Sequence, residues 1–129
     1  MPTIQELAAQ LYAERPAGVI IDEEAVTACA LAAVRFYAGY ADLEADQAEE
    51  RRTVLENIKP ETELTAGEWS VIRPLFMLYA ERETAYQLEA SRAMGVDVFG
   101  RSVSEISNEI LQVENEIPLK AFVHNIIEI

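Results

Sequence analysis

Apolar residues recur at helical spacing along most of the chain, and several of these stretches follow a capping residue. Thr3 and Glu6 form a T-x-x-E capping box before the first stretch, which "RPAG" ends near Glu14. Asp22 is a good N-cap for a second helix, because the helix dipole favours the two glutamates that follow it. We expect this helix to run past Tyr40. The pattern therefore predicts two amphipathic helices at the start of the chain.

The next segment, residues 42–59, is polar and reads "DLEADQAEERRTVLENIK". Its apolar positions are too sparse to predict one long buried helix, and we expect helix for part of it only. Pro60 and its neighbours "KPETE" predict a loop.

A long helix is predicted from Thr65 to Met94. Thr65 and Glu68 form a second capping box at its start, and Gly95 is a suitable C-cap. Its first half is apolar almost all round, whereas its second half is charged over most of its surface. Pro74 lies too far inside for a first-turn proline, so it should bend the helix or displace its start.

A third capping box, Ser102 with Glu105, begins another helix, which we expect Pro118 to end. The tail "LKAFVHNIIEI" has no clean period, so helix and extended strand both remain open for it. The sequence thus predicts an all-α fold: a small bundle of four to five helices, one of them long and kinked. The bundle domain covers residues 1–118, and residues 119–129 form an irregular or extended C-terminal arm.

The charge of the chain narrows the range of partners. With 10 basic and 23 acidic residues the net charge is −13, which argues against binding to a phosphate backbone. This charge fits high solubility, a partner with a basic face, or a surface that repels DNA. The single cysteine, Cys29, lies in an alanine-rich apolar run, so we expect a buried, reduced thiol.

No secretory signal or membrane span is predicted. The most apolar window, residues 25–41, is interrupted by Arg35 and is mostly weakly hydrophobic alanine, so it fits a buried helix better than a span. We expect Arg35 to pair with a carboxylate in a structural role. On these grounds the protein should be soluble and intracellular.

The sequence shows no pattern typical of a catalytic or metal-binding site. Carboxylate-bridged metal bundles use Glu-x-x-His pairs, but the only histidine, His124, follows Ala121 at that spacing. Nothing in the sequence supports a nucleophilic pair between Cys29 and His124, and no glycine-rich phosphate loop is present. We therefore predict a protein that is not an enzyme and that binds no metal or cofactor.

Two segments remain unexplained by a self-contained bundle. The charged half of the long helix has a narrow apolar stripe that suits packing against other copies, and the arm carries many apolar side chains that should not stay free in solvent. The arm either returns to its own core or docks on a neighbour. The candidate interface residues are Arg82, Tyr86, Arg92, Met94, Phe122, Val123, Ile126, Ile127 and Ile129.

The early helix "EEAVTACALAAVRFYAGYADL" and the long segment "LTAGEWSVIRPLFMLYAERETAYQLEASRAMGVDVFGRS" resemble head–tail connector (adaptor) proteins of tailed bacteriophages. The resemblance covers roughly residues 22–102. It implies a helical virion protein that forms a ring, commonly of twelve copies, beneath the portal protein. It implies no catalytic residues. Its place would be the head–tail junction of the virion, and the host cytoplasm before assembly.

The resemblance also implies what such a ring does. It would extend the portal channel, dock the next neck or tail protein, and let DNA pass without specific binding, since an acidic lumen does not grip phosphates. The alternative prediction is an acidic protein-binding module, such as a DNA mimic or inhibitor acting on a basic partner. Its basis is the net charge, together with the 13 acidic residues between Met1 and Glu63.

Overall fold

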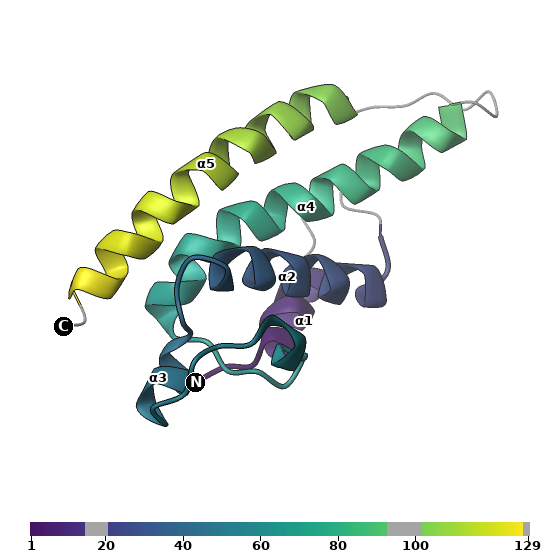
Figure 1. Ribbon diagram of the computed structural model, residues 1–129. Helices are drawn as coiled ribbons and strands as arrows, with labels where there is room; N and C mark the ends of the chain where they lie inside the picture. The colour runs from purple at the N-terminus through teal and green to yellow at the C-terminus, as the bar shows by residue number, and fades with distance from the viewer. Residues whose placement is uncertain (15–20, 93–101, 128–129) are drawn as a thin grey trace.

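The computed structural model describes residues 1–14, 21–92 and 102–127, and this part of the chain is all-α, as predicted (Figure 1). Apart from one isolated bridge between Thr3 and Glu63, it contains no β-structure. Its elements are α1 (Ile4–Glu14), α2 (Glu23–Ala38), α3 (Glu44–Ala48), the 3-10 helix η1 (Leu55–Asn57), α4 (Ala66–Arg92) and α5 (Val103–Ile127).

The predicted capping residues form the expected bonds. The Asp22 carboxylate accepts a hydrogen bond from the backbone N–H of Ala25 at 2.8 Å, and α2 begins directly after it. The capping box before α4 is reciprocal: the Glu68 N–H donates to the Thr65 hydroxyl, and the Thr65 N–H donates to the Glu68 carboxylate. α2 ends at Ala38 rather than beyond residue 40, so its predicted C-terminal end was too late.

Both internal prolines lie within helices. α4 is helical from Ala66 to Arg92 through Pro74, whose ring is exposed. The predicted helix end at Pro118 is wrong, because α5 continues through it to Ile127. Proline in a helix interior removes one backbone hydrogen bond and costs about 3 kcal/mol.

The burial of its neighbours explains why α5 continues past Pro118. Ile117 before it and Ala121 after it are both fully buried in the core. A helix that stopped at the proline would lose the packing of Ala121, so tertiary packing outweighs the local penalty. Residues 119–127, predicted as part of an irregular or extended arm, are therefore the last turns of α5.

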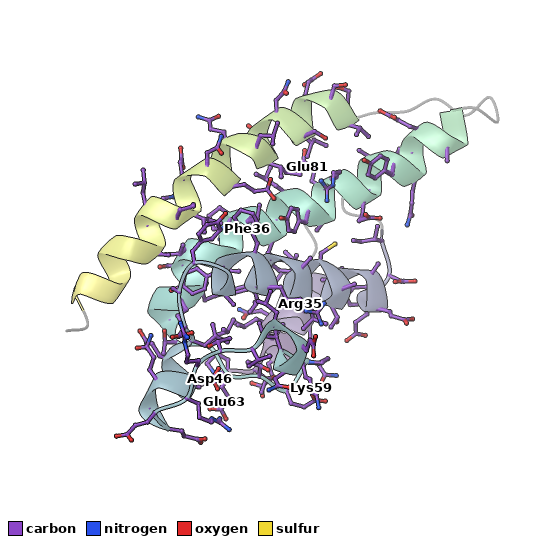
Figure 2. All side chains as sticks on the ribbon, viewed as in Figure 1. Arg35, Phe36, Asp46, Lys59, Glu63 and Glu81 are labelled. Carbon is purple, nitrogen blue, oxygen red and sulfur yellow. The ribbon has the colours of Figure 1, made fainter. Side chains whose placement is uncertain are left out.

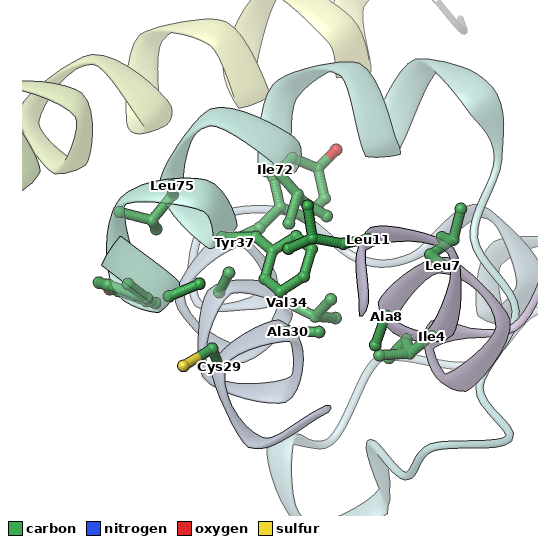
Figure 3. Close-up of a cluster of buried hydrophobic side chains, with 14 of the residues drawn as sticks. Ile4, Leu7, Ala8, Leu11, Cys29, Ala30, Val34, Tyr37, Ile72 and Leu75 are labelled. Carbon is green, nitrogen blue, oxygen red and sulfur yellow. The ribbon is translucent and has the colours of Figure 1, made fainter. Parts of the chain in front are cut away.

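α2 packs against α1, α4 and α5, and α4 packs along α5. In Figure 1, α1 and α5 lie on opposite sides of α4. Leu11 of α1, Tyr37 of α2 and Ile72 of α4 meet in the centre of the core (Figure 3). Alanines at positions 30 and 33 of α2 are fully buried, which lets neighbouring helices approach closely. Cys29 is also buried there, as predicted.

Hydrogen bonds made by side chains, rather than a core of its own, hold the polar segment between α2 and α4. The Thr53 hydroxyl accepts from the Leu43 N–H at 2.7 Å and donates to the Asp46 carboxylate at 2.8 Å. Arg35 extends from α2 toward this segment (Figure 2) and donates to the carbonyl of Ile58 at 3.3 Å. The partner of Arg35 is thus a backbone carbonyl and not the carboxylate that we predicted.

Candidate interaction surface

The outward face of α5 carries an uncharged ridge that is exposed to solvent. Leu111 and Leu119 are 59% and 71% exposed, which makes them the two most exposed leucines of the described chain. Asn108 and Asn115 are exposed on the same side of the helix. We call these four residues the α5 ridge. Exposed leucines are common singly; these two lie eight residues apart on one helical face, about 12 Å along the helix, with Asn115 between them.

Charged side chains flank the ridge along one edge. Glu116 and Lys120 lie there as an exposed pair, with the Lys120 Nζ 3.6 Å from the Glu116 carboxylate. Such a surface pair contributes well under 1 kcal/mol to folding, so both groups remain open to other partners. Glu109 lies on the same edge by helical spacing.

A part-buried polar contact joins α5 to α4. The Tyr79 hydroxyl of α4 donates to the Glu114 carboxylate of α5 at 2.7 Å. The Arg82 guanidinium lies over the Tyr79 ring, 5.1 Å from its centre. Burial raises the pKa of the Tyr79 hydroxyl, and the bond to Glu114 raises it further. Together with the burial of Ile106, Ile110 and Ile117, this contact sets which face of α5 is covered and which is left outside.

A groove lies between α1 and α4, on the side away from α5. It measures about 360 Å³ and has Leu7 and Leu11 of α1 on one wall. From α4 it is lined by Trp69, Arg73, Phe76 and Met77. We call it the α1–α4 groove.

The floor of the α1–α4 groove is apolar and its rims are polar. The rings of Trp69 and Phe76 pack at 5.4 Å between centres, and Trp69 and Met77 are only half-buried. The exposed Arg73 lies on the α4 rim, and the exposed Glu14 lies on the α1 rim. An apolar floor with charged rims is the usual anatomy of a protein-binding groove.

The groove and the ridge face in different directions. On α4, Met77 lines the groove and Tyr79 contacts α5. By helical spacing, the groove residues of α4 point from about 60° (Phe76) to about 160° (Met77) away from Tyr79. α1 and α5 also lie on opposite sides of α4 in Figure 1. One molecule thus carries the ridge and the groove as two separate surfaces.

A buried carboxylate joins α4 to the start of α3. Glu68 is fully buried and accepts hydrogen bonds from the backbone N–H groups of Glu44, at 2.9 Å, and Thr65, at 3.0 Å. Burial raises the pKa of the Glu68 carboxyl above its usual value of 4.5, although these hydrogen bonds oppose the rise. The carboxylate acts as a structural clamp, since its two oxygens accept hydrogen bonds from backbone N–H groups on two separate segments.

An acidic hollow lies at the start of α2. Asp22, Glu23 and Glu24 line it together with Thr27, and its volume is about 810 Å³. It is wide and open to solvent, and its carboxylates would favour a basic partner.

The predicted interface residues fall into three groups. Arg82 is half-buried over Tyr79, with its Nε atom buried and without a hydrogen-bond partner, whereas Tyr86 is 49% exposed. Arg92 is the last residue of α4, and Phe122, Val123, Ile126 and Ile127 lie in the final turns of α5. Met94 and Ile129 lie outside the described residues.

Sequence reasoning missed the leucines of the ridge. The inner side of α5 carries Ile106 and Ile110, which are buried, and Val113, which is half-buried. Leu111 and Leu119 do not fit that side. Two leucines eight residues apart and off the main apolar face are the signal that could have revealed the ridge.

The described residues offer little for metal binding, membrane insertion or thiol chemistry. They contain no group of three or more His, Cys, Asp and Glu side chains placed to hold a metal ion. None of the helices in this part of the chain is both long enough and apolar enough to cross a membrane. Burial raises the pKa of the Cys29 thiol to about 11, which leaves it a poor nucleophile at neutral pH.

Comparison with protein-family models, with curated proteins and with solved structures gives no match to this chain. The resemblance to head–tail connectors therefore stays a prediction from the sequence.

Proposed function

We propose that this chain is a structural ring component of a tailed-bacteriophage neck, a head–tail connector that extends the portal channel and docks the next neck or tail protein. The observation that carries the proposal is the α4–α5 hairpin, in which α5 leaves an uncharged ridge with two highly exposed leucines. A surface of this kind is better suited to contact with another protein than to chemistry.

The ridge and the α1–α4 groove support assembly into a ring. Two different surfaces of one subunit allow head-to-tail contacts, and such contacts form a ring when the rotation closes. The net charge of −13 supports a DNA channel, because a negative lumen repels phosphates and lets the duplex slide. The partners are other copies of this chain, a portal protein and a downstream neck or tail protein.

The experiment is electron microscopy of the purified chain, alone and after mixing with a candidate portal protein. The proposal expects rings with a central hole that stack on the portal ring. A chain that stays monomeric alone and never associates with portal or tail components would contradict it.

The acidic hollow at the start of α2 favours the second candidate, a module that binds a basic partner. The two candidate functions differ in how salt changes association. Binding to a basic partner weakens as salt screens the attraction, whereas self-association of a chain with net charge −13 strengthens, because salt screens the repulsion between copies. Sedimentation of the chain at low and moderate salt, with and without a basic DNA-binding protein, distinguishes the ring component from the binding module.

A further inference from the structure

We infer that the α5 ridge of one copy docks in the α1–α4 groove of the next, so that the occupant of the groove is a second copy of this chain. This inference rests on the proposed ring and names the two surfaces that build it. It requires a ridge and a groove that match in length, polarity and charge, and the described residues meet each requirement.

The lengths match. Leu111 and Leu119 are eight residues apart on α5, and Trp69 and Met77 are eight residues apart on α4. Both pairs therefore span about 12 Å along their helices. The two leucines of the ridge can reach the two ends of the groove at the same time.

The polarity matches as well. The ridge is exposed and uncharged, and the groove presents the half-buried Trp69 and Met77 at its surface. Docking would remove Leu111 and Leu119 from water, and the burial of apolar surface favours association. The half-buried tryptophan in the groove is the residue type that most often anchors such contacts.

Charge selects the orientation. Arg73 lies midway between Trp69 and Met77, and Glu116 lies beside Asn115 at the midpoint of the ridge. The same edge also carries Glu109 and Lys120, so it is net negative. The orientation that brings this edge to Arg73 pairs opposite charges, whereas the reverse orientation turns it toward Glu14 on the other rim and sets carboxylates together. In a chain this acidic, Arg73 is the group that makes the contact electrostatically acceptable.

The arrangement is head-to-tail because the ridge and groove are different surfaces, one on α5 and one between α1 and α4. Each copy thus donates its ridge to one neighbour and receives a ridge from the other. A two-fold pairing of ridge with ridge would instead leave both grooves empty, and this difference provides the test.

The test uses two single variants in sedimentation velocity. Leu119→Glu places a charge on the ridge at an exposed site, and Met77→Glu places one in the groove. We expect each variant to weaken self-association at least about tenfold relative to the unmodified chain. Mixed in equal amounts, they should form a dimer that does not grow further, since one intact ridge and one intact groove remain. Circular dichroism of each variant checks that the fold is kept.

A charge exchange provides the matched control. Arg73→Glu alone should weaken self-association, and adding Glu116→Arg in the same chain should restore it to within about threefold. A groove variant that still self-associates while the ridge variant does not would overturn the inference in favour of ridge-to-ridge pairing. Variants that form rings as well as the unmodified chain would overturn it and leave the proposed ring standing. An unmodified chain that stays monomeric throughout would contradict the ring itself.

Discussion

Replacing Glu68 by alanine should destabilise the fold far more than the same change in the equivalent capping box of α5. The Glu68 carboxylate is fully buried and accepts from the N–H groups of Glu44 and Thr65. A buried donor left without an acceptor costs about 1 to 3 kcal/mol. Glu68→Ala leaves two such donors without an acceptor. It also removes the cost of burying a carboxylate, so we expect the free energy of unfolding to fall by about 2 to 3 kcal/mol.

The matched control is Glu105→Ala. Glu105 belongs to the same kind of box, with the Ser102 hydroxyl 3.3 Å from its carboxylate, but it is exposed. In the variant, water takes the place of the hydrogen bonds that Glu105 makes, so we expect the free energy of unfolding to fall by about 0.5 kcal/mol. Urea unfolding measures both variants, with the slope m checked for constancy. A Glu68→Ala chain no less stable than Glu105→Ala would refute the assignment of Glu68 as a clamp.

The pH dependence gives a second readout of the same group. Because burial raises the pKa of Glu68 in the folded chain, its contribution to stability is fully present below its usual pKa of 4.5 and is lost as pH rises through the raised value. The difference in unfolding free energy between the unmodified chain and Glu68→Gln should therefore grow as pH falls from 7 toward 4. A difference that shrinks over this range would mean that the folded chain lowers this pKa.

Three further predictions concern side chains of α2, α4 and α5. Tyr79→Phe removes the donor to Glu114 and should cost about 1 to 2 kcal/mol in urea unfolding, whereas Tyr37→Phe removes a buried hydroxyl without a described hydrogen-bond partner and should cost nothing; equal losses would contradict this contrast. Cys29, with its pKa raised to about 11, should react with a disulfide reagent at pH 8 about a hundredfold more slowly in the folded chain than in urea, and rapid labelling of the folded chain would contradict its burial. Pro118→Ala restores an N–H donor inside α5 and should stabilise the chain by up to about 3 kcal/mol in urea unfolding, whereas a destabilised variant would show that proline suits this position.

Helix starts were predictable from the sequence because their cause is local. The bonds of Asp22 to Ala25 and of Thr65 to Glu68 join residues three apart, so the residue types and their spacing suffice. The end of the last helix was not predictable from Pro118 alone. It depends on the burial of Ala121 in the core, which involves helices far away in the sequence.

The candidate surface was predictable only in part. The sequence indicates that the second half of α4 and the end of the chain carry surplus apolar and charged groups. It does not indicate that Tyr79 binds Glu114, and this contact helps to fix which side of α5 is covered. The exposed face with Leu111 and Leu119 is a consequence of that packing, and so is its direction relative to the groove beside Trp69.

Native mass spectrometry of the unmodified chain over a range of concentrations tests the central claim most directly. Head-to-tail docking of ridge into groove predicts one dominant closed oligomer of many copies, for which the resemblance implies twelve, with intermediates that disappear as concentration rises. A spectrum that contains only monomer, or a dimer that never grows, at every concentration would contradict the account.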